Sequence, residues 1–162
     1  MVKKDIGFTI EVYASAAALE PADAALLEKA RAVTALAYAP YSNFHVSAVA
    51  RLKDGQEVIG TNQENASYPV ALCAERVLLS AAATIHPGVG IDTMAISYKN
   101  IAGESDTPIS PCGMCRQALA EYEERTAQPI RLILGGQQGE VFIIQSAKQL
   151  LPLTFTSGDL KK

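Results

Sequence analysis

Three cysteines are the residues of this sequence best suited to chemistry. Cys112 and Cys115 form a C-x-x-C pair, and Cys73 precedes them in the chain. An odd number of cysteines leaves one thiol over in any disulfide pairing, so a disulfide framework fits poorly. Thiolates are stabilised at helix N-termini and bind zinc, so a metal site is possible. The C-x-x-C pair alone also fits a redox pair, and a lone buried cysteine is often only an apolar filler.

Glu75, two residues after Cys73, favours a catalytic metal over these alternatives. Residues two apart on a helix do not share a face, so Cys73 and Glu75 can converge only on something beyond the open end of the helix. A catalytic zinc has three protein ligands and keeps one position for water, beside which a carboxylate can act as general base and acid. The simpler alternative for Glu75 is an acidic residue of the kind favoured in any first helical turn.

A fourth protein ligand would close the site and make it structural rather than catalytic. His45 and His86 are the only histidines of the chain, so a structural Cys3His zinc-binding module is the non-enzymatic alternative. We expect His86 to neutralise the carbonyl end of a predicted helix and His45 to lie on the alternate face of a predicted strand. The ligand count therefore favours an open site.

The elements that must position these residues follow from apolar spacing. Helices are predicted from Pro21 until Pro40 ends the pattern, over residues 74–86, and from Ser110-Pro111, with Ser110 as the cap of the third helix. Strands are predicted at 44–52, 57–61, 94–98, 130–134 and 141–144, with a short helix near 146–151. Strands that alternate with helices after an opening hairpin indicate an α/β fold of three layers, α/β/α, with a mixed β-sheet.

Composition limits the class of protein. The chain has 162 residues, of which 49% are apolar and 26 are Ala, so one domain with closely packed helices is expected. A net charge of −3 provides no basic patch for nucleic acid, and no apolar run approaches the length of a membrane helix. Asp5 and Glu11 interrupt the apolar run near the N-terminus and disfavour a secretory signal, so we expect a soluble, cytoplasmic protein. Residues 6–13 fit either a short strand or a flexible extension.

The sequence resembles cytidine deaminases of the small branch whose zinc is held by three cysteines. The matching segments are residues 39–44, 60–69, 73–76 and 111–117, with a weaker match at 150–152 and Phe155. The resemblance covers about residues 21–160. It implies a single cytidine deaminase domain over 21–162 and leaves residues 1–20 as an N-terminal extension. Ser47 and Val77 depart from the Gly and Thr that are usual in the family.

The resemblance also implies a reaction and the residues that perform it. The reaction is hydrolytic deamination of cytidine and deoxycytidine to uridine and deoxyuridine with release of ammonia, in pyrimidine salvage by a homotetramer with shared active sites. One Zn²⁺ per subunit would be held by Cys73, Cys112 and Cys115, and Glu75 would move the protons. Substrate contacts are implied for Phe44 on the pyrimidine, Ala74 at its carbonyl oxygen, Asn62 and Glu64 on the ribose 3′-hydroxyl, and Tyr68 and Phe155 at a neighbouring subunit's pocket. Arg76 would offset the negative charge of three thiolates.

Simpler roles exist for several of these positions. Asn62 and Glu64 could belong to a polar turn, Phe44 to the core, and Arg76 to a solvated helix surface. The same signature serves deaminases of polynucleotides, of blasticidin-type antibiotics and of free nucleosides. The missing basic patch disfavours polynucleotides, and the pair of Asn62 and Glu64 favours a ribose-bearing small molecule.

Overall fold

The structure is a computed structural model that describes residues 1–161, and its centre is a six-stranded sheet. The strand order is β1-β6-β5-β4-β2-β3, and β4 pairs with β5 in parallel while the other pairs are antiparallel. The strands are β1 (Glu11–Tyr13), β2 (Phe44–Leu52), β3 (Glu57–Thr61), β4 (Ile91–Asn100), β5 (Arg131–Gly135) and β6 (Val141–Ile144). The predicted mixed sheet is therefore confirmed.

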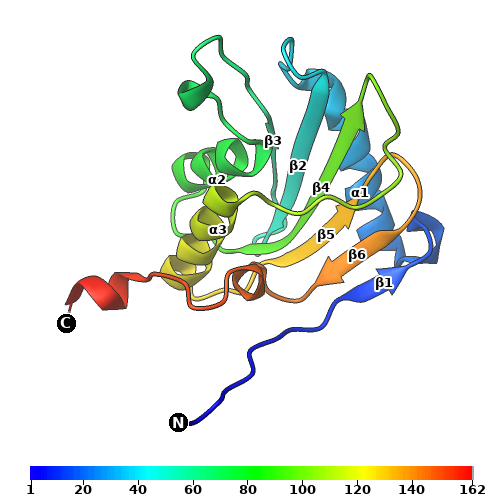
Figure 1. Ribbon diagram of the computed structural model, residues 1–162. Coiled ribbons are helices and arrows are strands. Elements are labelled where there is room, and N and C mark those ends of the chain that lie inside the picture. Colours follow the sequence, from blue (N-terminus) through cyan, green and yellow to red (C-terminus); the bar gives the residue numbers. More distant parts are fainter. Residues whose placement is uncertain (162) are drawn as a thin grey trace.

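Three α-helices cover the sheet: α1 (Pro21–Val33), α2 (Ala74–Ile85) and α3 (Gly113–Thr126). Helix α1 lies on one face, and α2 and α3 lie side by side on the other (Figure 1). Short 3₁₀ turns occur at Ala16–Ala18, Thr34–Leu36, Tyr68–Val70, Ala147–Leu150 and Ser157–Lys161. The three-layer α/β/α prediction is confirmed. Among residues 1–161, no helix has the length and apolar character needed to cross a bilayer.

Strand β2 shows how the alternating pattern builds two cores. Ala48 and Ala50 are fully buried in the core beneath α2 and α3, whereas Val49 is buried in the core beneath α1. Ser47 belongs to the α1 side as well, where its hydroxyl donates to the carbonyl of Ala30 at 2.5 Å. The departure at Ser47 from the family's usual glycine is thus accommodated by a buried hydrogen bond.

Helix α2 packs directly onto β3 at Gly60. A Cβ atom at this position would lie 2.4 Å from the carbonyl oxygen of Ala74 and 2.5 Å from the backbone nitrogen of Leu78. Real Cβ contacts are not this short, so only glycine permits the observed approach. The consequence is that the first turn of α2, which carries Ala74 and Glu75, is held close to the end of the β2–β3 hairpin.

Two predicted helix boundaries are wrong. The first helix ends at Val33 rather than near Pro40. After the 3₁₀ turn, the backbone N–H of Tyr38 donates to Asn62 and the carbonyl of Tyr38 accepts from Glu64, so this segment pairs with the chain leaving β3. The third helix begins at Gly113 with Cys112 as its N-cap, two residues later than predicted. Pro111 stays outside because Cys112 is extended, with φ −67° and ψ 168°, and the carbonyl of Pro111 accepts a side-chain hydrogen bond from Arg116 instead.

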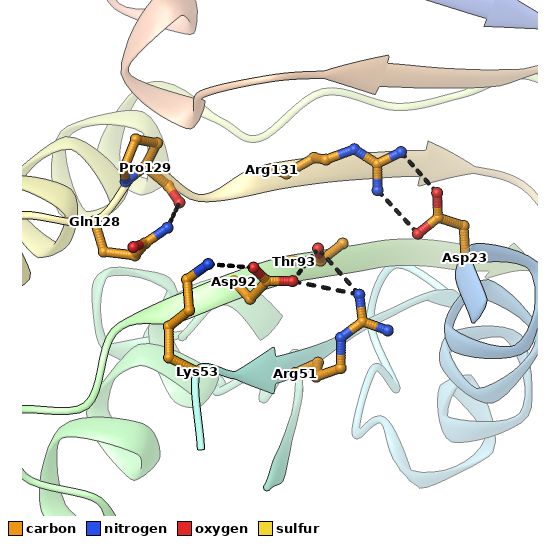
Figure 2. Close-up of polar contacts among 8 residues, drawn as sticks. All are labelled: Asp23, Arg51, Lys53, Asp92, Thr93, Gln128, Pro129 and Arg131. Atoms are coloured by element: carbon orange, nitrogen blue, oxygen red, sulfur yellow. Dashed lines mark hydrogen bonds and ion pairs between the residues drawn. The ribbon is translucent and has the colours of Figure 1, made fainter. Parts of the chain in front are cut away.

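Ion pairs lie near the end of β2 and the starts of β4 and β5 (Figure 2). The carboxylate of Asp92 accepts from Lys53 at 2.6 Å and from Arg51 at 3.3 Å. The bond from Lys53 chiefly, with those from Thr93 and Arg51, lowers the pKa of Asp92. The guanidinium of Arg131 makes two hydrogen bonds to the carboxylate of Asp23, at 2.9 and 2.6 Å, which ties the first turn of α1 to β5.

The N-terminal residues add a strand to the sheet. Strand β1 pairs antiparallel with β6, with Val12 opposite Phe142, and residues 1–10 run away from the sheet (Figure 1). The short-strand prediction for residues 6–13 is therefore confirmed for Glu11–Tyr13. The next 3₁₀ turn, Ala16–Ala18, leads directly into α1.

We predict that Gly60→Ala destabilises the protein by about 1 to 3 kcal/mol, because the added methyl group overpacks the contact between β3 and α2. Urea unfolding should show a lower midpoint with an unchanged slope. Gly7→Ala is the matched control, since no atom lies within 4 Å of the added Cβ there. Equal stability of the two variants would contradict the proposed close packing.

Candidate active site

The three cysteines meet where α2 and α3 begin. Cys73 is the N-cap residue of α2, Cys112 is the N-cap residue of α3, and Cys115 is buried in the first turn of α3. The Sγ atoms of Cys73 and Cys112 are 3.8 Å apart, and those of Cys112 and Cys115 are 3.4 Å apart. With Zn–S bonds of about 2.3 Å, sulfurs around a tetrahedral zinc lie about 3.8 Å from each other. The cluster therefore fits a Zn²⁺ ion.

The pKa values of Cys73 and Cys115 are shifted in opposite directions. The hydrogen bond with Cys115 chiefly, together with that of Cys112 and the positive charge of Arg76, lowers the pKa of Cys73 to about 6. The same interaction with Cys73, together with burial, raises the pKa of Cys115. The site thus favours a thiolate at Cys73 near neutral pH, and a cation would be needed to hold three thiolates so close together.

Glu75 lies in the first turn of α2 and only 4% of its surface is exposed. Burial raises the pKa of its carboxyl group, and hydrogen bonds from its own backbone N–H and from Cys115 oppose this effect. A carboxyl group whose pKa is raised toward neutrality can both accept and donate a proton under physiological conditions. The burial of Glu75 beside the sulfur cluster is consistent with its predicted role in proton transfer, which stays a prediction.

No histidine completes the cluster. Within residues 1–161, the three cysteines form the only group of three or more His, Cys, Asp or Glu side chains that could hold a metal. His86 lies at the C-terminal end of α2, where its Nδ1 is 3.8 Å from a carboxylate oxygen of Asp54. The structural Cys3His alternative therefore lacks its fourth ligand in this part of the chain.

A cavity of about 370 Å³ adjoins the cluster. Cys73, Cys112 and Glu75 form part of its wall, and Ile109, Ser110 and Met114 line it from the α3 side. The remaining lining residues come from β2, the chain after β3 and the start of α2: Val46, Asn62, Glu64, Tyr68, Ala71, Leu72 and Ala74. The cavity thus brings together, from separate parts of the chain, two of the three predicted metal ligands, the buried carboxyl group and four of the predicted substrate contacts.

Asn62 and Glu64 are fixed by their neighbours. The side chain of Asn62 accepts from the backbone N–H of Val46 at 2.8 Å and donates to the carbonyl of Phe44 at 2.9 Å. The carboxylate of Glu64 accepts from the backbone N–H of Tyr41 at 2.9 Å and from the backbone and hydroxyl of Ser42. The hydrogen bond from the hydroxyl of Ser42 is the main cause that lowers the pKa of Glu64, and those from the backbone N–H groups of Tyr41 and Ser42 lower it further.

Sequence reasoning gave Ser42 no role, although it lies in one of the segments that carry the resemblance. Its hydroxyl donates to Glu64 and accepts from the backbone N–H of Phe44 at 3.1 Å. A small hydroxyl residue in a turn before β2 and a carboxylate after β3 form a pair that could have indicated this contact from the sequence.

Four of the predicted site residues lie outside the cavity wall, and the buried Cys115 is one of them. Phe44 stacks on Tyr98 with ring centroids 4.9 Å apart. Phe155 is 59% exposed, and its carbonyl accepts from the side chain of Gln117. Arg76 lines a groove between α2 and α3, although its charge still acts on Cys73. Their roles toward substrate and sulfur stay predictions.

The family model of the cytidine and deoxycytidylate deaminase zinc-binding region matches residues 21–128. The chain belongs to this family. The matched region contains all three cysteines and Glu75, so the described cluster coincides with the zinc-binding region of cytidine deaminases. Because members of the family are hydrolytic deaminases, the protein is an enzyme of this class.

Individual relatives agree with this assignment. The cytidine deaminase of Halalkalibacterium halodurans is 38% identical over 124 residues, which cover 76% of this chain and 86% of the relative. The crystal structure of cytidine deaminase from Burkholderia pseudomallei is similar with a TM-score of 0.70 and 40% identity, covering 81% of this chain and 97% of that one. The cytidine deaminase of Mycobacterium leprae gives a TM-score of 0.60 at 34% identity and covers 79% and 95%.

We predict that Cys112→Ala abolishes zinc retention and lowers the thermal midpoint, because two buried or half-buried thiols then lose the cation that holds them. Metal analysis of the purified variant and thermal unfolding test this. Met114→Ala is the control, since Met114 lies between the cysteines but offers no thiolate. Full zinc occupancy in Cys112→Ala would contradict the ligand assignment.

Proposed function

We propose that this enzyme is a zinc-dependent cytidine deaminase, which hydrolyses cytidine and deoxycytidine to uridine and deoxyuridine with release of ammonia. The observation that carries the proposal is the buried carboxyl group of Glu75, which shares one cavity with the three-sulfur cluster and with Asn62 and Glu64. A role in cytoplasmic pyrimidine salvage, which the reaction and the sequence resemblance suggest, is part of the same proposal.

The zinc ligands in this proposal are Cys73, Cys112 and Cys115. When bound, Zn²⁺ supplies a Lewis acid that makes water nucleophilic near neutral pH. Arg76, one residue after Glu75, is proposed to offset the net negative charge that three thiolates leave on the ion. Its electrostatic effect on Cys73 supports this role.

Glu75 is the proposed catalytic acid and base. It takes a proton from the attacking water and gives that proton to ring N3 of the pyrimidine as the C4–O bond forms. It then delivers the second proton of the water to the amino group, so that the C4–N bond breaks and ammonia leaves. One water is consumed, and the carboxyl group returns to its starting state.

The substrate contacts follow from the walls of the cavity. We propose that Asn62 and Glu64 hold the ribose 3′-hydroxyl, because an amide and a carboxylate can share the donor and acceptor of one hydroxyl. The amide nitrogen of Asn62 carries two hydrogens, and its bond to the carbonyl of Phe44 uses one of them. The backbone N–H of Ala74 is proposed to donate to the pyrimidine carbonyl, and Phe44 to lie along the ring.

We also propose a homotetramer with shared active sites. Tyr68 is 72% exposed and lines the cavity, and Phe155 is 59% exposed. Exposed aromatic side chains near a pocket are suited to reach into a neighbouring subunit. Light scattering on active protein should give a mass of four chains, and a monomeric mass with full activity would refute the shared site.

We predict that Glu75→Gln keeps zinc and binds substrate but loses turnover by roughly 10²- to 10⁴-fold, because the amide cannot carry protons. Metal analysis and the loss of the cytidine chromophore measure the two effects separately. Glu121→Gln, at an exposed carboxylate of α3, should leave kcat unchanged. Undiminished turnover in Glu75→Gln would refute the assignment.

A substrate panel tests the specificity. Cytidine and deoxycytidine should be deaminated, whereas cytosine, 3′-deoxycytidine and a cytosine-containing oligonucleotide should react poorly, because they lack the 3′-hydroxyl contact or need a basic groove. The related alternative is a deaminase of another cytosine-containing small molecule. Faster deamination of blasticidin S than of cytidine would favour that alternative.

A further inference from the structure

Arg116 joins two segments that are distant in the chain. It lies in the first half of α3, directly after Cys115. Its Nε donates to the carbonyl of Pro111 at 2.8 Å, and its Nη1 donates to the carbonyl of Leu150 at 3.0 Å. One guanidinium therefore binds the backbone before the metal ligand Cys112 and the backbone of the C-terminal segment.

The bond to Pro111 holds the backbone directly before Cys112. Pro111 is buried, and a buried carbonyl without a donor is costly. The carbonyl of Cys112 already accepts the first helical bond, from the backbone N–H of Arg116 at 2.9 Å. Arg116 thus contacts the chain on both sides of the Cys112 Cα atom, once through its backbone and once through its side chain.

A second side chain of α3, two turns further along the helix than Arg116, binds the same C-terminal segment. Glu123 is buried, and its carboxylate accepts from the hydroxyl of Ser146 at 2.9 Å and from the backbone N–H of Lys148 at 3.4 Å. Glu123 therefore holds the start of the 3₁₀ turn Ala147–Leu150, while Arg116 holds its end. Residues seven apart lie on one helix face, so α3 fixes this turn with two charged side chains.

We propose that Arg116 is a positioning residue, which couples the geometry of Cys112 to the C-terminal segment and thereby slows the loss of zinc. The proposal rests on the zinc site described above. Two carbonyls in different segments require two donors in a fixed fork, which an arginine supplies and a lysine does not. The C-terminal segment is then a support of the metal site as well as the carrier of Phe155.

The first test compares zinc release from Arg116→Lys, Glu123→Gln, Arg125→Lys and the unaltered enzyme. Each protein is mixed with an excess of a zinc-chelating dye, at temperatures equally far below its own unfolding midpoint. Arg116→Lys should release zinc about tenfold faster than the unaltered enzyme, the lower end of the range for residues that orient metal ligands. Glu123→Gln loosens the other end of the same turn but leaves the bond to Pro111, so its zinc release should be slower than that of Arg116→Lys. Arg125→Lys, whose side chain stacks on Tyr122, controls for the substitution itself.

A second readout separates positioning from general damage. Added zinc should restore kcat in Arg116→Lys, because all catalytic groups are still present, but should not restore it in Glu75→Gln. Zinc release from Arg116→Lys no faster than from Glu123→Gln would overturn the proposal. Zinc retained without formation of uridine would overturn only the proposed function, and an unaltered enzyme that binds no zinc would overturn both.

A third measurement needs no variant. Coupling through Arg116 works in both directions, so removal of zinc by a chelator should speed amide hydrogen exchange in residues 146–151. Residues 21–33 of α1, which lie across the sheet, serve as the internal control and should exchange at an unchanged rate. Equal exchange in residues 146–151 with and without zinc would contradict the coupling.

Discussion

Three sulfur atoms brought within 4.8 Å of one another constrain the rest of this structure. Three thiolates at such distances repel each other unless a cation lies between them, and the hydrogen bonds among the thiols lower the pKa of Cys73 and raise that of Cys115. Two helix N-termini must point to the same place to achieve this, and each supplies unpaired backbone amides there. The positions of α2 and α3 on the sheet follow from that requirement.

The helices reach this arrangement through small residues. Gly60 lets the first turn of α2 lie against β3, and fully buried Ala48 and Ala50 let the helical layer approach β2. The high alanine content, from which closely packed helices were expected, thus brings the helical layer close to the sheet beside the site. On the other side of the cavity, hydrogen bonds of Asn62 and Glu64 to the backbone of residues 41–46 hold the polar wall without help from the metal.

Much of this could be predicted from the sequence, because the relevant signals are local or chemically specific. The hairpin of β2 and β3, the end of α2 near His86 and the meeting of three cysteines beside Glu75 are confirmed. The two wrong helix boundaries involve contacts that local apolar spacing does not show. Beyond the end of α1 at Val33, Tyr38 pairs with residues 62–64. At the start of α3, Cys112 is extended and the carbonyl of Pro111 accepts from the side chain of Arg116. The contacts of Ser42 and Arg116 were not predicted, because their partners Glu64 and Leu150 are 22 and 34 residues away in the sequence.

The connectivity of the sheet places the predicted zinc ligands where a bound ion would link two separate parts of the chain. Helix α2 connects β3 to β4, and α3 is the crossover between the parallel strands β4 and β5, so Cys73 and Cys112 belong to two successive connections. An ion bound by both closes a loop of the chain in the way that a disulfide does, and closing a loop reduces the conformational freedom of the unfolded chain. In a protein whose three cysteines form no disulfide, a zinc ion bound by this cluster would thus also act as a cross-link.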